Sequence, residues 1–324
     1  MRRRYQIGLS LLLAVSAITP ASAQELEKLS IVVFGAPSLG AFLPPVIKQL
    51  KLDEKYGMSI DFQERTPDAY TAQFNSGEFK VGGSAALLTV GLADIRGVKV
   101  TYLFNLFDYW GAVVTSHPEI KTIKDLEGKD IAAAKGTTNY VMFDWFARQL
   151  GVDTSKLSVV NTATPGLVGY ALADRATAVQ LWEPAYTTLH AKKPSIQLLD
   201  LKIAESWQKA TGSRNIPYLG VAAHVDWAEQ HKALIPKLYA AYKDAGAWTV
   251  AHPDDAAKLI SPKGNDGDRK AIADIILANE RLGMNIRAAA EVKKEIRSVY
   301  DAGRSIAFLP SDPSDATIYG GPMQ

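Results

Sequence analysis

The chain has 324 residues, of which 36 are basic and 34 acidic, so its formal net charge is +2. Arg2, Arg3 and Arg4 account for the whole excess, because the residues from Gln24 onward include 33 basic and 34 acidic side chains. This near-neutral balance provides no general electrostatic attraction to nucleic acid or to an anionic membrane, and neither is expected as a partner.

The first 23 residues have the pattern of a secretory signal peptide. Three arginines precede a short apolar run from Ile7 to Ile18, and Ala21-Ser22-Ala23 has the small residues that signal peptidase recognises. The run is shorter than the roughly 20 residues of a membrane span, so an uncleaved anchor is the less favoured alternative. Cleavage after Ala23 would leave residues 24–324, enough for one large domain or two medium ones.

The sequence contains no cysteine and five histidines. An exported chain without disulfides depends on its hydrophobic core for stability, and without a cysteine at the cleavage site no lipid anchor is expected. These features indicate a soluble protein of the periplasm. The histidines lack the spacing of zinc-binding motifs, so no metal and no cofactor is expected.

Strand-like and helix-like segments alternate from Leu29 onward, a rhythm typical of parallel βαβ units that bind ligands at the carboxyl ends of strands. Strands are predicted over residues 29–34, 58–64, 79–81 and 98–106. Helices are predicted over residues 41–51, 70–76 and 84–95.

The rhythm restarts after Trp110. Strands are predicted over residues 111–116, 130–134, 157–161, 176–181 and 221–223. Helices are predicted over residues 123–126, 137–150, 166–173, 234–250, 254–259, 268–282 and 288–302. We therefore predict one lobe from residues 24–110 plus 216–324 and a second from residues 111–215. The cleft between two such lobes is a favoured place for a ligand.

The segment Lys135-Gly136-Thr137-Thr138-Asn139 lies between a predicted strand and a predicted helix. A phosphate-binding loop needs a lysine after its second glycine, but here Lys135 precedes the glycine, so a nucleotide triphosphatase is excluded. Thr137 or Thr138 could simply cap the helix. The same helix start could instead bind an anion or a polar ligand through its free N–H groups.

A second strand-to-helix candidate is Gly82-Gly83-Ser84-Ala85-Ala86. Three interpretations remain open for Ser84: the nucleophile of a secreted serine hydrolase, the cap of a helix, or a ligand contact. The nucleophile motif is incomplete, because its last glycine is missing.

Three more sites follow predicted strands, and each alone could be a turn or part of the core. They comprise Ser38 and Leu39, the aromatic segment Asp108-Tyr109-Trp110, and Trp182-Glu183 before Pro184. If the strands are parallel, their ends converge on one cleft.

Three segments in a fixed order resemble a known family. TIKDLEGKDI at 122–131, KGTTN at 135–139 and VQLWEP at 179–184 are similar to the sulfonate/nitrate/taurine and thiamine-precursor group of ABC-transporter substrate-binding proteins. The resemblance covers roughly residues 29–225. It implies the type II periplasmic binding protein fold, with two α/β lobes, two hinge strands and a ligand between the lobes. It also implies a monomer that serves an inner-membrane permease and is not an enzyme.

The resemblance also implies where ligand contacts lie, with Glu183 replacing the aspartate that is usual in the family. The contacts that it implies are Ser38, Leu39, Ser84, Ala85, Thr137, Thr138, Asn139, Trp182 and Glu183. Independently of the resemblance, Asp108, Tyr109, Trp110 and Tyr218 are further candidate contacts.

The charges of these candidates suggest a ligand class. The helix start at 136–139 favours a negative or acceptor group, whereas Glu183 and Asp108 across the cleft would need a positive or donor group, because an unpaired buried carboxylate is costly. We therefore expect a small organic compound with a nitrogen and an acceptor group rather than a bare anion such as nitrate. Taurine and sulfonates are favoured; a pyrimidine or another nitrogen heterocycle is the alternative.

Overall fold

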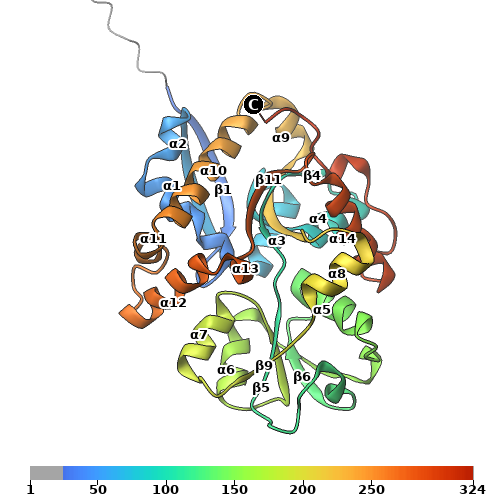
Figure 1. The fold of residues 1–324 in the computed structure, drawn as a ribbon. Helices are drawn as coiled ribbons and strands as arrows, with labels where there is room; N and C mark the ends of the chain where they lie inside the picture. The colour runs from blue at the N-terminus through green and yellow to red at the C-terminus, as the bar shows by residue number, and fades with distance from the viewer. Residues whose placement is uncertain (1–24, 324) are drawn as a thin grey trace, which may run out of the picture.

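The computed structural model describes residues 25–323 of the chain, so the predicted signal peptide lies outside the described residues. Two α/β lobes are seen one above the other in Figure 1, and each is built around its own β-sheet. No helix within residues 25–323 is long and apolar enough to cross a membrane.

The first lobe contains a six-stranded sheet in the order β11-β4-β10-β3-β1-β2. Its strands are β1 (Glu27–Phe34), β2 (Met58–Arg65), β3 (Val81–Ala86), β4 (Val100–Asp108), β10 (Pro217–His224) and β11 (Met284–Ala288). Strand β1 pairs in parallel with β2 and β3, and β10 is antiparallel to both β3 and β4. Strands β1 to β4 therefore all run in one direction and end at the same edge of the sheet.

Helices cover both faces of this sheet, with α1 and α10 on one side and α4 and α14 on the other (Figure 1). The helices of the first lobe are α1 (Leu43–Gln49), α2 (Leu52–Lys55), α3 (Pro67–Ser76), α4 (Leu87–Ile95), α9 (Val225–Gln230), α10 (Ile235–Ala251), α11 (Pro253–Ile260), α12 (Asp266–Leu277), α13 (Asn279–Leu282) and α14 (Lys293–Ser305).

The second lobe is also built around a β-sheet, which has five strands in the order β7-β6-β8-β5-β9. Its strands are β5 (Ala112–Thr115), β6 (Asp130–Ala133), β7 (Ser158–Asn161), β8 (Ala178–Leu181) and β9 (Gln197–Leu199). Its helices are α5 (Thr138–Gln149), α6 (Leu167–Leu172), α7 (Ala185–Lys192) and α8 (Ile203–Thr211). Strand β6 is parallel to β7 and β8, whereas β5 is antiparallel to β8 and β9.

The chain passes between the two sheets twice, from β4 to β5 and from β9 through α8 to β10. Because β4 ends where the chain leaves the first lobe, the carboxyl ends of β1 and β3 face the second lobe. Because β5 enters the second lobe antiparallel to β8, the carboxyl ends of β6 and β8 face the first. The carboxyl ends of these strands therefore lie on the sides of the two sheets that face each other.

The prediction of a strand at 79–81 followed by a helix from Ser84 is wrong. Strand β3 runs from Val81 to Ala86 with every residue buried, and α4 begins only at Leu87. The glycines serve close packing: a Cβ on Gly82 would lie 2.2 Å from the Tyr70 hydroxyl, and one on Gly83 would lie 2.9 Å from that of Tyr242. Glycine is used here for the approach of neighbouring side chains rather than for a turn.

Several elements differ from the expectation. Strands β9 and β11 and helices α7 and α8 lie where no such element was predicted, and residues 41–51 do not form one helix. Helix α1 ends at Gln49, and Lys51 has the left-handed φ of 52°, which separates α1 from α2.

Candidate functional site

The start of α5 combines a helix cap with an exposed preceding loop. Thr137 is its N-cap: the hydroxyl accepts a hydrogen bond from the Tyr140 N–H at 3.3 Å and donates one to the Ala134 carbonyl at 2.8 Å. Lys135 and Gly136 are exposed, and a Cβ placed on Gly136 would meet no atom within 4 Å. The first N–H groups of a helix have no partner inside the helix, and at α5 they follow directly on this exposed loop.

Thr138 and Asn139 follow the cap and are only 2% and 1% exposed. Within the part of the chain that the structure describes, the Thr138 hydroxyl and the Asn139 side-chain oxygen have no hydrogen-bond partner. Buried polar atoms are almost always paired with protein, water or ligand. Each of these two atoms is therefore available for a hydrogen bond with a water molecule or with a ligand.

Asn139 also joins the two lobes. Its side-chain nitrogen donates to the Tyr218 hydroxyl on β10, and its carbonyl accepts a bond of 3.4 Å from the Tyr109 hydroxyl. The Tyr109 ring lies edge-on to Tyr218 and stacks on Phe146 of α5, with centroids 5.9 and 5.7 Å apart. Burial raises the pKa of both tyrosines. Three of the predicted residues thus form one buried contact between the lobes.

Glu183 is not the free carboxylate that the sequence suggested, so that part of the ligand argument is wrong. It is 1% exposed and accepts bonds from the Thr187 N–H at 3.1 Å and the Thr187 hydroxyl at 2.8 Å. Arg281 of α13 approaches it from the first lobe, with Nε 3.6 Å from Oε1. Burial raises the pKa of Glu183, and the bonds from Thr187 oppose that effect.

Sequence reasoning missed both partners of Glu183. Thr187 lies one helical turn beyond Glu183, so the spacing of a capping interaction could have identified it. Arg281 lies in a different lobe, and no local pattern connects it to Glu183. Nearby, the half-buried Trp182 follows β8, and the Trp110 ring lies 5.5 Å from that of Tyr186.

Asp108 is also paired already. Its carboxylate accepts hydrogen bonds from the side-chain amides of Asn285 at 2.8 Å and Asn105 at 3.0 Å. Burial raises the pKa of Asp108 to about 6, and the two amides oppose this rise. The second predicted carboxylate therefore does not require a positive group from a ligand.

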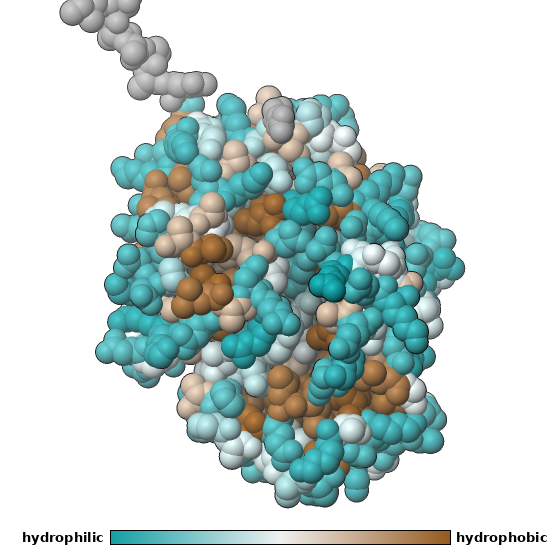
Figure 2. All heavy atoms as spheres, viewed as in Figure 1, coloured by the Kyte–Doolittle hydropathy of each residue, from teal (hydrophilic) through white to brown (hydrophobic). Residues whose placement is uncertain are grey.

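Asp108 and Trp110 lie on a groove of about 810 Å³ that both interlobe passages border. Residues 198–205, 279–280 and 283–285 also line it. Figure 2 shows this face of the molecule, which is hollowed where the lobes meet. The groove adjoins the β4–β11 edge of the first sheet, whereas β1 and β3 lie on the other side of β10. Asp108 and Trp110 are thus separated from the strand ends of β1 and β3.

The raised pKa of Asp108 predicts a pH-dependent penalty. Because the folded-state value of about 6 exceeds the ordinary 3.8, the contribution of this group to stability is intact below pH 4 and is lost as the pH rises to 6 or 7. Relative to Asp108→Asn, the wild-type free energy of unfolding should fall by about 1.4 kcal/mol per pH unit, or about 2–3 kcal/mol in all. Urea denaturation of both proteins from pH 4 to 7 measures this. A difference that stays constant over that range would contradict it.

The first-lobe candidates are mostly structural. Ser38 caps a short 3-10 helix by accepting the Gly40 N–H at 3.2 Å, and Leu39 is buried. Ser84 lies inside β3, fully buried, and its hydroxyl accepts the Phe34 N–H at 2.9 Å. Ser84 is therefore neither a helix cap nor an accessible nucleophile, and this placement does not support the hydrolase interpretation.

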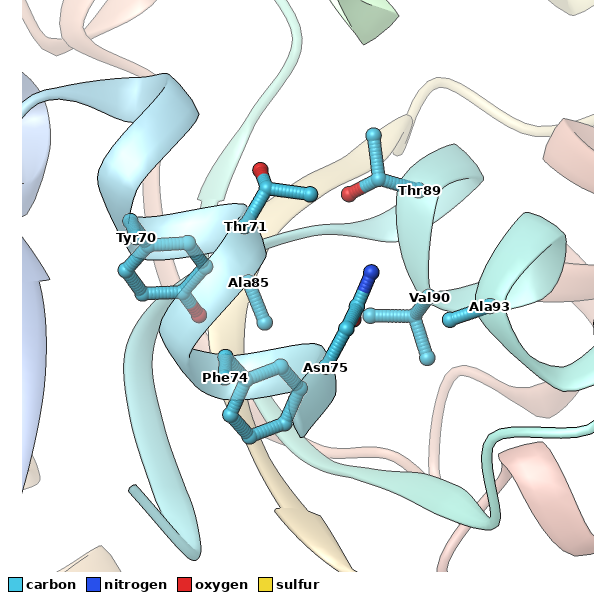
Figure 3. Close-up of a pocket in the computed structure, with 8 residues that line it drawn as sticks. All are labelled: Tyr70, Thr71, Phe74, Asn75, Ala85, Thr89, Val90 and Ala93. Carbon is cyan, nitrogen blue, oxygen red and sulfur yellow. The ribbon is translucent and has the colours of Figure 1, made fainter. Parts of the chain in front are cut away.

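Ala85 lines a cavity of about 10 Å³ between α3 and α4, about the space that one water needs. Figure 3 shows Thr71 and Asn75 from α3 and Thr89 from α4 around it. Sequence reasoning missed these three polar residues. Among residues 25–323, no group of three or more His, Asp or Glu side chains is arranged to hold a metal ion.

Comparison with known proteins gives one family and many solved structures. The family model described as NMT1/THI5 like matches residues 54–256, which is more than half of the chain. Comparison with curated proteins gives no match.

Three solved structures illustrate the likeness. The periplasmic aliphatic sulphonate binding protein SsuA from Escherichia coli has a TM-score of 0.73 at 17% identity, covering 93% of this chain and 94% of that one. The alkanesulfonate-binding protein SsuA from Xanthomonas axonopodis pv. citri, bound to MOPS, has a TM-score of 0.73 at 16% identity, covering 91% and 99%. The Candida albicans CA3427 gene product, described as exhibiting the generic periplasmic binding protein fold, has a TM-score of 0.66 at 18% identity, covering 92% and 97%. The fold implied by the resemblance is thereby confirmed.

Proposed function

Because the chain belongs to the NMT1/THI5-like family, we propose that it is the periplasmic solute-binding subunit of an ABC importer. It captures a small organic compound between its lobes and delivers it to an inner-membrane permease. This role needs no chemical step, only an arrangement of the lobes that the ligand stabilises. The signal-peptide pattern of residues 1–23 supports export to the periplasm.

The observation that carries the proposal is the pair of unpartnered polar atoms at the start of α5, the Thr138 hydroxyl and the Asn139 side-chain oxygen. A ligand acceptor group can take hydrogen bonds from the hydroxyl and from the free N–H groups of the helix start, where the helix dipole also favours negative charge. The Asn139 oxygen can take a donor from the same ligand or from a bound water.

A sulfonate-like ligand fits this arrangement best. A sulfonate presents several acceptor oxygens on one charged group, and charge-assisted hydrogen bonds are the stronger kind. Because Glu183 and Asp108 are paired within the protein, an amino group is not required, although taurine remains within the proposed class. The names of the similar sulfonate-binding structures support the same class. The free Asn139 oxygen favours an amino-substituted pyrimidine as the second candidate.

Calorimetric titration with ethanesulfonate, taurine, nitrate and an aminopyrimidine tests the proposal. We expect ethanesulfonate and taurine to bind with affinities within about tenfold of each other, or about 1.4 kcal/mol, and both more tightly than nitrate. Thermal unfolding provides a parallel measurement, since a ligand at a hundredfold excess over its Kd stabilises by about 2.7 kcal/mol. Nitrate binding most tightly would contradict the sulfonate proposal, and preferential binding of the aminopyrimidine would favour the second candidate.

A further inference from the structure

One ion pair joins the two lobes. Arg281 on α13 belongs to the first lobe, and its Nε lies 3.6 Å from Oε1 of Glu183, which follows β8 in the second. Every other salt bridge in the described part of the chain lies within one lobe. Among the described residues, Arg281 is thus the one cation whose salt-bridge partner lies in the other lobe.

Arg281 has a second contact in the other lobe. Its guanidinium lies over the Tyr186 ring, 5.6 Å from the centroid, within the range of a cation–π interaction. The backbone segment that carries Arg281 is held within the first lobe by hydrogen bonds on either side of it. The Asn279 side chain accepts a hydrogen bond from the Met284 N–H at 2.9 Å and donates one to the Met284 carbonyl at 3.2 Å. A fixed helix in one lobe therefore presents a cation to a carboxylate and an aromatic ring in the other.

The Glu183 carboxylate keeps hydrogen-bond partners when its contact with Arg281 breaks. Both of its carboxylate oxygens accept hydrogen bonds from Thr187 in its own lobe. Removing the sole partner of a buried charge is strongly destabilising, but here Thr187 stays in place when Arg281 leaves. Arg281 itself is 31% exposed and can be hydrated. The pair therefore suits reversible contact between the lobes.

We propose that Arg281 is a positioning residue for ligand capture. By pairing with Glu183 and stacking on Tyr186, it stabilises the arrangement in which the lobes lie together. This inference rests on the proposed solute-binding function. A contact present only in the closed arrangement raises the apparent affinity by shifting the population toward that arrangement.

The first test needs no ligand. The chain contains no cysteine, so spin labels at Ala72→Cys in the first lobe and Lys129→Cys in the second report the interlobe distance alone. Arg281→Gln should shift the ligand-free distance distribution toward longer values. The matched control is Arg304→Gln, which removes an exposed ion pair with Asp312 inside the first lobe and should leave the distribution unchanged. An unchanged distribution for Arg281→Gln would overturn the inference.

The second test measures capture. Dissociation of ethanesulfonate should become about 3- to 10-fold faster in Arg281→Gln. Arg281→Lys keeps the charge but stacks less well on the ring, so its dissociation rate should lie between that of Arg281→Gln and that of the wild type. In a Glu183→Gln background, Arg281→Gln should have a reduced effect, and an undiminished effect would overturn the role of the pair. If ethanesulfonate does not bind at all but Arg281→Gln still lengthens the distance between the spin labels, the sulfonate proposal is wrong. The inferred role of Arg281 in holding the lobes together would then still be supported.

Discussion

Thr138→Val is expected to weaken ethanesulfonate binding at least about tenfold while leaving the free energy of unfolding unchanged or slightly higher. The Thr138 hydroxyl is buried and has no partner within residues 25–323, so the ligand-free protein loses no hydrogen bond when valine replaces it. Valine has nearly the same shape and removes an unsatisfied polar group. The complex, in contrast, loses a hydrogen bond to a charged group, which contributes about 1.5–3 kcal/mol. Calorimetry and urea denaturation measure the two quantities.

Thr137→Ala is the matched control, since it alters the neighbouring threonine. Its hydroxyl caps α5 and already has partners at Tyr140 and Ala134. This variant should lose about 1 kcal/mol of stability with the cap, and its affinity should change much less than that of Thr138→Val. If both variants lose stability and neither loses affinity, the helix start is only a cap and the ligand binds elsewhere.

Gly220→Ala is expected to destabilise the protein by about 2–3 kcal/mol through overpacking. Gly220 lies in β10, and a Cβ there would sit 2.3 Å from the Phe104 carbonyl oxygen and 2.3 Å from the Tyr102 hydroxyl. The first of these atoms belongs to the backbone of β4, so relief requires the two paired strands to separate. Thermal and urea denaturation of the ligand-free protein measure the loss.

Gly169→Ala provides the opposite control. Gly169 lies in α6, and a Cβ at this position would meet no atom within 4 Å. Alanine is the better helix former, so this variant should be unchanged or up to about 1 kcal/mol more stable. Equal unfolding midpoints for the two variants would show that the close approach at Gly220 is tolerated.

The fold was predictable where buried faces leave a clear pattern. The run 29–34, which is rich in β-branched residues, corresponds to β1, and the short apolar run within 130–134 corresponds to β6. The predicted passages near residues 110 and 216 fall between strands of different sheets. Prediction failed where tertiary packing determines the secondary structure. The glycines of β3 resemble a turn until Tyr70 and Tyr242 are known to pack on them. Strand β11 is only partly buried over residues 284–287, so its sequence lacks a strong strand pattern.

The residues of the candidate site also differ in how well the sequence predicts their roles. The start of α5 was predictable because a strand, a glycine and hydroxyl residues in succession form a local motif, and Thr137 is the cap that the motif predicts. The role of Glu183 was not predictable, because its charge is balanced by Arg281. That residue is distant in sequence and reaches Glu183 only through the packing of the lobes. Asp108 is similar, since its partner Asn285 comes from the neighbouring strand β11.

The position of β10 between β3 and β4 has a consequence for the order of folding. All strands of the second sheet lie within residues 112–199, so that sheet can assemble from one continuous stretch of chain. The first sheet cannot, because the strand that separates β3 from β4 is supplied only by residues 217–224. Its completion requires closing a loop that contains the entire second sheet, and such non-local pairing is slow. Until β10 is inserted, β3 and β4 expose unpaired edges, which makes partly folded chains prone to aggregation.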